Sequence, residues 1–422
     1  MRMDEGDLAV LLYRASHAPR RPGVELDVER DEAVEAALRA HGEAEMRRVT
    51  RGLAVGMEVP ERNADELLRR PGWVFDDLRW ELGGPAQALG RAVVRLTLWP
   101  ETVVPVLREH LVDRTELLVD VETGLLLRLV EVFGGRPVRT LTVRRIGPEE
   151  AVPDREGETF SVGDRSMRAP EVGTAARMTV LTLGRMAFDP SMRRLLRGRE
   201  VPAEPEVPFR RTDPEPLDGP VPSVPEVVRL LALARPSDLA GTLRGEFADG
   251  RFAVADGGRF RLDFTRSAGP AAAQAESYDG ERHYRLMPDR LVVDPAPPAL
   301  FSPLGEVRRP RGELRRPIAV LDLVDWEGRR AVRLAVGGDT VVVDAGTGLV
   351  LANPYLELHD LGPAPTDPEF YRLRAPEGVP VVETDGGPLG DALLPPPLRA
   401  GLEGAARVVG GLAEGVARLL GR

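Results

Sequence analysis

Residues 116–135 alternate between polar and apolar side chains on either side of one short polar break. Alternation of this kind predicts two β-strands, each with one buried face. The break is typical of a tight turn, because Asp120 can accept hydrogen bonds from nearby backbone N–H groups and Gly124 adopts a left-handed backbone without strain. We therefore predict a hairpin with a structural corner at Asp120 and Gly124.

The same pattern returns at residues 340–358, with Asp344 and Gly348 at the corresponding positions. Two further segments recur in the same order along the chain. The matched segments are 90–96 with 328–334, 119–127 with 343–351, and 168–171 with 374–377. Because the order is kept while the separations differ, we predict a tandem duplication whose loops have changed in length.

An amphipathic helix is predicted before the strands of each half. Apolar residues on one face follow Asp4 in the first half, and Ser223 with Glu226 forms a capping-box pattern at the start of the second. Further helices are predicted after the third matched segment of each half, at 174–188 and 398–420.

The second half also has the pattern of a run of antiparallel strands. The dipeptides Asp256-Gly257 and Asp279-Gly280 each separate two alternating stretches, which is typical of a β-hairpin. Further strands are predicted at 290–294, 317–324, 329–336, 339–344 and 348–355.

These elements predict an α+β protein with two related domains, each an antiparallel curved sheet with flanking helices. A chain of 422 residues is too long for one ordinary core. Residues 200–222 contain seven prolines and many acidic residues, a composition typical of an extended, semi-rigid linker. The predicted units are a first domain at 1–199, the linker at 200–222, a second domain at 223–380, and a proline-rich arm with a C-terminal amphipathic helix at 381–422.

Composition and charge exclude several classes of function. The net charge of −10 argues against general nucleic-acid binding, because that affinity comes from neutralised phosphates. All 57 basic residues are arginine, which is typical of GC-rich codon usage. The absence of cysteine excludes disulfides, thiolate metal sites and a cysteine nucleophile. The five histidines have no metal-ligand spacing, so neither a metal nor a cofactor is predicted.

Motifs for catalysis are missing from the sequence. It contains no nucleophile elbow, no P-loop and no dinucleotide-binding fingerprint. The Asp-Gly turns lack the acidic ligand pattern of a calcium loop. We expect His283 to be a solvent-facing strand residue and His359 to lie in a loop. The chain is therefore predicted not to be an enzyme.

The start of the chain differs from a secretory signal. Acidic residues stand where such a signal has basic ones, and Arg14 interrupts the apolar run. No stretch of 18 apolar residues occurs, so no transmembrane helix is predicted. These observations predict a cytoplasmic location.

The order of helix, antiparallel strands, VVVDAGTGLVL corner and a later Phe-containing tail with Arg-Ala-Pro resembles the LolA/RseB superfamily. This superfamily includes periplasmic lipoprotein carriers and sigma-factor regulators. The resemblance implies an unclosed half-barrel with an apolar interior, and Phe160 and Phe370 take the place of a phenylalanine near the domain end. It covers residues 223–380 best. Residues 29–49 are charged and helix-favouring where early strands are implied, so the first domain is predicted to be a degenerate copy.

Aromatic residues of the second domain are candidates for the lining of an apolar cavity, and ordinary core packing is the alternative interpretation. The candidate ligand-binding residues are Trp326, Tyr278, Tyr284, Phe252 and Phe264.

The C-terminal segment 398–420 has apolar residues at heptad spacing together with several glycines. Three interpretations stay open, namely docking on its own domain, pairing with a partner or a second copy, and lying on a membrane surface. The candidate contact residues are Leu402, Val409, Leu412, Val416 and Leu419.

The leading functional prediction is a non-catalytic binding or regulatory protein that recognises an apolar ligand or a protein segment on a concave sheet. The first alternative is a carrier or sensor of lipid-like molecules with a cavity in the second domain. An enzyme of unrecognised type is the remaining alternative. The predicted partners are an apolar small molecule or a protein, with peripheral membrane contact open and nucleic acid excluded.

Overall fold

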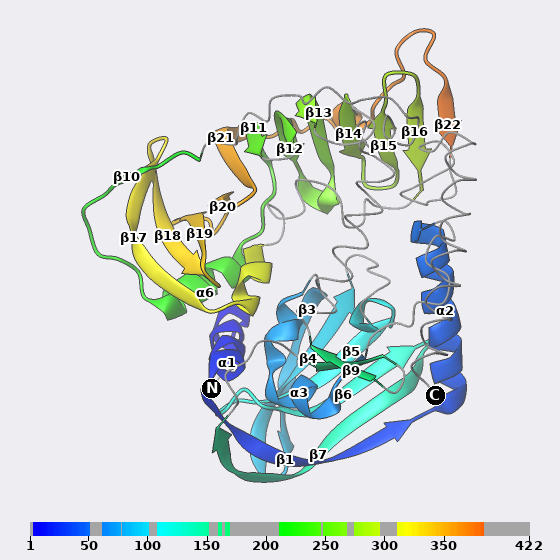
Figure 1. Ribbon diagram of the computed structural model, residues 1–422, viewed down its shortest axis with the longest axis vertical. Helices are drawn as coiled ribbons and strands as arrows, with labels where there is room; N and C mark the ends of the chain where they lie inside the picture. The colour runs from blue at the N-terminus through cyan, green and yellow to red at the C-terminus, as the bar shows by residue number, and fades with distance from the viewer. Residues whose placement is uncertain are drawn as a thin grey trace, which may run out of the picture.

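The computed structural model describes residues 3–50, 61–76, 78–100, 108–151, 159–162, 165–168, 211–245, 248–267, 274–295 and 310–383. Figure 1 shows the sheet of the first half at the bottom and the longer sheet of the second half across the top. The sheets are mostly antiparallel, curved and open, so the predicted α+β class with two half-barrel-like halves is confirmed.

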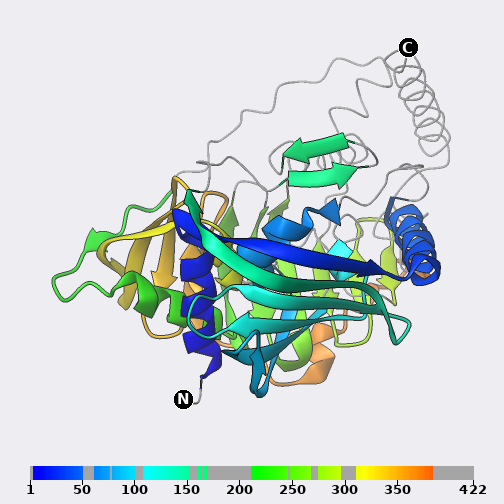
Figure 2. The ribbon, with the colours of Figure 1, turned by 90° about the horizontal axis from the view of Figure 1, so that it is seen from below.

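The first half is built on a six-stranded antiparallel sheet with the order β1-β7-β6-β5-β4-β3. A small second sheet has the order β2-β8-β9. Figure 2 shows α1 and α2 at opposite ends of β1. The elements are α1 Glu5–His17, β1 Arg20–Arg30, α2 Glu32–Thr50, β2 Glu61–Arg62, α3 Ala64–Arg69, η1 Pro71–Phe75, β3 Leu78–Ala88, β4 Arg91–Pro100, η2 Arg108–His110, β5 Arg114–Asp120, β6 Leu126–Phe133, β7 Arg136–Ala151, β8 Thr159–Val162 and β9 Arg165–Arg168.

The second half carries a 13-stranded sheet with the order β10-β17-β18-β19-β20-β21-β11-β12-β13-β14-β15-β16-β22. Its last pair, β16 with β22, is parallel. The elements are β10 Glu215–Pro216, α6 Val224–Leu233, β11 Leu239–Gly245, β12 Ala248–Val254, η3 Asp256–Gly258, β13 Phe260–Ser267, β14 Ala275–Tyr278, β15 His283–Leu286, β16 Leu291–Asp294, η4 Pro310–Arg315, β17 Ile318–Trp326, β18 Arg329–Val336, β19 Asp339–Asp344, β20 Val350–Ala352, β21 Leu356–Pro363, η5 Pro368–Tyr371 and β22 Val381–Glu383.

Both halves connect their strands in the same way. The first strand after the leading helix, β1 or β11, pairs with the last strand of a five-stranded meander, β7 or β21. The meanders are β3 to β7 and β17 to β21, and a 3-10 helix, η1 or η4, comes directly before each. The halves differ between the first strand and the meander, where the first half has α2 and α3 and the second has β12 to β16.

The two corner motifs occupy equivalent places. The N–H of Gly124 donates to the carbonyl of Asp120 at 2.9 Å, and that of Gly348 donates to Asp344 at 3.0 Å. Both glycines have a left-handed backbone, with φ of +74° and +73°. Each lies under the leading helix of its half, and a Cβ on Gly348 would stand 2.5 Å from the carbonyl oxygen of Leu230 in α6. Glycine is therefore required both by the turn and by the close approach of the helix.

A continuous apolar core joins the two halves. Leu8 and Leu12 of α1 belong to the same cluster of buried residues as Val227 and Leu231 of α6. The two helices pack against each other, and so do η1 and η4. The hydroxyl of Tyr13 in α1 accepts a hydrogen bond of 2.7 Å from the N–H at the start of β17. The leading helices therefore form the junction of the molecule.

Most predicted elements lie at their expected positions. A capping box starts α1 at Asp4 and α6 at Ser223. The predicted strand 348–355 is wrong in its extent, because the side chain of Asn353 accepts hydrogen bonds from two backbone N–H groups and turns the chain between β20 and β21. The helices predicted at 174–188 and 398–420 lie outside the described residues. So do the contact residues Leu402, Val409, Leu412, Val416 and Leu419.

Candidate functional site

The aromatic residues predicted to line a cavity lie in packed parts of the second sheet. Trp326 is 2% exposed, and its indole N–H donates to the carbonyl of Leu358 at 2.8 Å. Phe252 is buried in the same apolar cluster, and Phe264 and Tyr278 pack at its margin. The structure thus brings four of the five candidates together on β12, β13, β14 and β17.

Tyr284 lies apart from the other four. Tyr278 pairs with His283 across β14 and β15, so these two side chains lie on one face of the sheet. Tyr284 directly follows His283 in β15 and therefore faces the opposite side. There it is buried with Leu291 and Leu373. Its hydroxyl donates to Asp279 at 2.8 Å, at the tip of the β14–β15 hairpin.

An open cleft of about 580 Å³ lies at this tip. Two hairpin turns that are separate in the sequence form its walls together with η5. Its lining consists mainly of charged residues and glycine, and the residues are Asp256, Gly257, Arg259, Asp279, Gly280, Glu281, Pro368, Glu369 and Arg372. The sequence predicted both Asp-Gly turns, and their meeting is a property of the tertiary structure alone.

The carboxyl group of Asp279, which lines the cleft, has a lowered pKa. Burial by itself raises the pKa of Asp279, but the backbone N–H groups of Arg282 and Glu281 bind the carboxylate and hold its pKa below the ordinary value. Arg372 adds an ion pair, with its Nε 3.4 Å from the same carboxylate. The group is therefore a carboxylate at neutral pH.

Arginines that stack on aromatic rings hold η5 against the sheet. The guanidinium of Arg259 lies 5.4 Å from the ring centre of Tyr371, and that of Arg261 lies 4.8 Å from the ring of Phe370. Arg261 also donates to the carbonyl of Phe370 at 2.9 Å. The phenylalanine singled out in the sequence, Phe370, thus fixes the third wall of the cleft. Phe160 belongs to β8 of the first half, where the side chains are not described.

The prediction of a solvent-facing His283 is wrong. His283 is 3% exposed, and its Nε2 lies 2.8 Å from Glu276 on the neighbouring strand. Burial opposes ionisation of Glu276, yet His283 and Arg285 lower the pKa of this carboxyl to about 2. Alternation within one strand did not reveal this partner, because Glu276 lies on β14 and His283 lies on β15, on the other side of the turn.

His359 is also placed differently from the prediction. It lies within β21, not in a loop, and it is 6% exposed. Its ring stacks on Trp326, with the ring centres 5.5 Å apart. The neighbouring Glu327 and Glu357 lie on either side of it.

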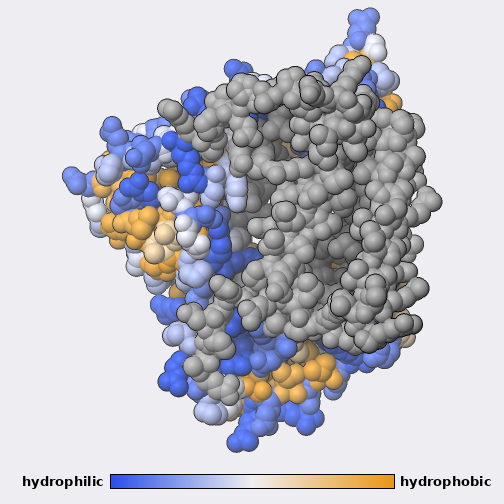
Figure 3. All heavy atoms as spheres, in the orientation of Figure 1, coloured by the Kyte–Doolittle hydropathy of each residue, from blue (hydrophilic) through white to orange (hydrophobic). Residues whose placement is uncertain are grey.

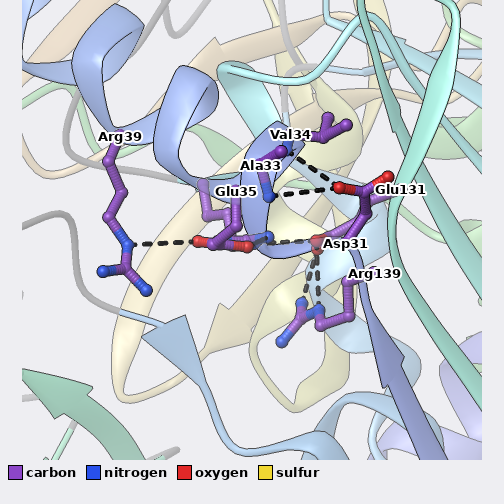
Figure 4. Close-up of polar contacts among 8 residues, drawn as sticks. Asp31, Ala33, Val34, Glu35, Arg39, Glu131 and Arg139 are labelled. Atoms are coloured by element: carbon purple, nitrogen blue, oxygen red, sulfur yellow. Dashed lines mark hydrogen bonds and ion pairs between the residues drawn. The ribbon is translucent and has the colours of Figure 1, made fainter.

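The first half contains a buried charge cluster of its own. Arg108 donates from its two Nη atoms to Glu35 of α2, each at 2.7 Å, and from Nε to Glu131 of β6 at 2.7 Å. Arg139 of β7 also donates to Glu131, and Figure 4 shows Arg39 on the outer side of Glu35. This cluster fastens α2 and η2 to the sheet, and sequence analysis did not find it because its members are far apart in the chain.

Neither a metal site nor a membrane span is found in the part of the chain that the structure describes. No three histidine, aspartate or glutamate side chains in these residues gather in a way that could hold a metal ion. No helix there is long and apolar enough to cross a bilayer.

Comparisons with known proteins give distant likenesses. No family model matches the sequence, and no curated protein matches it. An uncharacterized conserved protein from Thermus thermophilus has a TM-score of 0.25 and 12% identity over 37% of this chain and 97% of its own. MucB has a TM-score of 0.25 and 18% identity over 36% of this chain and 62% of its own. The MucA/MucB complex of Pseudomonas aeruginosa has a TM-score of 0.21 and 12% identity over 86% of this chain and 100% of its own.

The predicted cytoplasmic location is wrong by comparison with these neighbours, because MucB-type proteins are periplasmic. The prediction rested on acidic residues near the start of the sequence. In the structure, Asp4 caps α1 and, together with Asp7, binds Arg229 of α6. These acids therefore belong to helix capping and to the junction of the halves.

Proposed function

We propose that this chain is a non-catalytic binding protein that recognises a protein segment at the cleft between the β12–β13 turn, the β14–β15 turn and η5. The observation that carries the proposal is the chemistry of the lining. Eight of its nine residues are charged or glycine, and Pro368 is the remaining one.

Such a lining suits a peptide better than a lipid. Backbone and side-chain polar groups of a peptide can replace the water that leaves the cleft, whereas an acyl chain would desolvate charges without compensation. The aromatic residues that a lipid would need, such as Trp326 and Phe252, are packed in the core. A lipid-carrier role is therefore the second candidate, and no described cavity favours it.

The cleft also offers free charges to a partner. No ion pair with another described residue occupies the carboxylates of Asp256 or Glu281, and both side chains are exposed. Arg259 uses its Nε on the carbonyl of Asp256 at 3.0 Å, which leaves its outer nitrogens for a ligand. Rim charges of this kind set partner choice and association rate.

A second surface feature supports a protein partner. Figure 3 shows apolar side chains gathered over the region of β17 and β18. Leu321 of β17 is 51% exposed, and Val221 and Leu217 of the adjoining segment are 49% and 38% exposed. A contiguous apolar patch on a protein surface is common at protein contacts.

The test is selection of peptides on the immobilised full-length chain, followed by calorimetric measurement of their affinity. Glu281→Arg reverses an exposed cleft charge and is expected to weaken binding about tenfold or more, equivalent to roughly 1.4 kcal/mol. Glu25→Arg makes the same charge change on β1 of the first half and is expected to leave the affinity unchanged.

Equal affinities of both variants would contradict the cleft as the site. Native mass spectrometry separates the lipid alternative. A bound mass of a lipid-like molecule that is lost on denaturation would favour the carrier role over the peptide-binding role.

We also propose that the two halves arose by tandem duplication. The support comes from the equal strand connections, from the equal hydrogen bonds at the corners, and from the place of each corner glycine under the leading helix. The arginine that faces each corner aspartate is also in an equivalent position, Arg91 with Asp120 and Arg329 with Asp344.

A further inference from the structure

The proline-rich segment between the halves is docked along the second sheet. Glu215 and Pro216 pair with Asp325 and Val324 at the edge of β17, and the N–H of Leu217 donates to Leu323 at 2.8 Å. We call residues 211–217 the strap. Pro214 and Pro216 have no N–H, so the strap makes few ladder hydrogen bonds of its own.

A buried carboxylate anchors the start of the strap. Both the backbone N–H and the hydroxyl of Thr212 donate to Glu357 of β21, at 2.7 and 2.8 Å. Glu357 is 2% exposed, and Nε2 of His359 lies 3.2 Å from it. On the other side of the ring, Nδ1 lies 2.7 Å from Glu327, which also accepts from the N–H of Asp360.

The ring of His359 bridges two carboxylates only when both of its nitrogens carry protons. A neutral imidazole has one N–H and one acceptor nitrogen, and the acceptor would face a carboxylate oxygen with no proton between them. Trp326 stacks on the ring, with an angle of 26° between the two ring planes. The geometry therefore corresponds to an imidazolium.

The other charged groups near this site come from three elements. Arg244 of β11 stands opposite Glu357 in the sheet register. Arg329 of β18 lies beside β21 and donates to the carbonyl of Leu361 at 3.0 Å. Asp213 of the strap pairs with Arg333 at 3.3 Å. None of these contacts Glu357 and Glu327 together, so the histidine ring is the cation that joins them.

We propose that His359 is a proton-dependent latch that fastens the strap to β21 and β17. With two protons on the ring, Glu357 has a cationic partner and stays buried beneath Thr212. With one proton, the ring of His359 is neutral. The buried carboxylate of Glu357 then has only neutral hydrogen-bond donors, and the nearby Glu327 repels it. Such a carboxylate is stabilised by hydration, and water reaches it when the strap moves away.

The direction of the pH dependence follows from the same contacts. The hydrogen bond to Glu357 raises the pKa of His359, and Glu327 adds to this against the opposing effect of burial. A raised pKa means that the contribution to stability is complete below the ordinary histidine pKa and is lost as the pH rises through the value in the folded protein. The latch is therefore closed in acidic buffer and opens toward alkaline pH.

The experiment is hydrogen–deuterium exchange of the strap in the full-length chain, measured by mass spectrometry over this pH range and corrected for the intrinsic exchange rate. We expect several-fold loss of protection for peptides covering 212–217 as the pH rises. The midpoint is expected to coincide with the titration of the His359 ring followed by NMR. His359→Gln is expected to exchange at the alkaline level at every pH.

Two controls separate the latch from a general loss of structure. His41→Gln changes a histidine of α2 in the first half and is expected to keep the wild-type pH dependence. Thr212→Val removes the hydroxyl contact and is expected to raise strap exchange in acidic buffer while the His359 titration persists. The proposal is overturned if wild-type strap protection is constant across the range, or if His359→Gln retains its pH dependence.

Discussion

At the scale of single residues, the buried charges inside the first half make its stability depend on pH. Burial opposes the charge of Glu131, but Arg139 and Arg108 lower its pKa from 4.5 to about 2. A carboxyl with a depressed pKa contributes stability that is present above its ordinary pKa and is lost as the pH falls through the folded value. We expect the first half to lose stability between about pH 4.5 and pH 2 for this reason.

Glu131→Gln is expected to lower the free energy of unfolding by about 3 kcal/mol, because two buried guanidinium groups lose their shared anion. Urea denaturation followed by circular dichroism measures the change. Glu116→Gln removes one partner of an exposed ion pair with Arg114 and is expected to cost less than about 0.5 kcal/mol. Equal losses in the free energy of unfolding for both variants would show that the buried cluster contributes no more to stability than an exposed ion pair.

The corner glycines combine backbone strain with close packing. Gly348→Ala is expected to destabilise the protein by more than about 2 kcal/mol, since a Cβ would stand 2.5 Å from a carbonyl oxygen of α6 in addition to the left-handed strain. Gly90→Ala is the matched control, with φ of +71° and no atom within 4 Å of the added Cβ. Its expected cost is about 1–2 kcal/mol, and thermal denaturation compares the two.

At the scale of elements, the contact of α1 with β17 ties the halves together. Tyr13→Phe removes the acceptor of the N–H of Ile318 and leaves that buried group without its partner. We expect a loss of about 1–3 kcal/mol in the free energy of unfolding. Tyr355→Phe, at a residue 49% exposed, is the control and is expected to cost clearly less than Tyr13→Phe. A neutral Tyr13→Phe would mean that α1 is held by apolar packing alone.

Local patterns predicted the elements well where the deciding interactions are local. Capping by Asp4 and Ser223 lies within one turn of helix, and alternation in β18 and β19 lies within one strand. The break between β20 and β21 was missed, although Asn353-Pro354 is a turn signal, because apolar residues continue on both sides of it.

At the scale of the whole molecule, the shared core predicts cooperative unfolding. Buried residues of α1, α6, β4, β5 and β18 belong to one cluster, so each half loses part of its core without the other. We expect a single calorimetric transition for the full-length chain, with equal calorimetric and van't Hoff enthalpies. Two separate transitions would show that the halves are independently stable and would contradict this expectation.

Local sequence patterns were sufficient to predict the class of the fold, the positions of most helices and strands, and the repeated corner, because capping, alternation and turn chemistry act over a few residues. The sequence also indicated the aromatic residues of the second half, although it left open whether they line a cavity or fill a core. The packing of four of them against one another became visible in the tertiary structure. That structure alone brought the turns at Asp256 and Asp279 to one cleft, gave His283 and His359 their carboxylate partners, and placed Thr212 on Glu357. Those contacts join residues on different strands or far apart in the chain, and their energy depends on burial that no local pattern records.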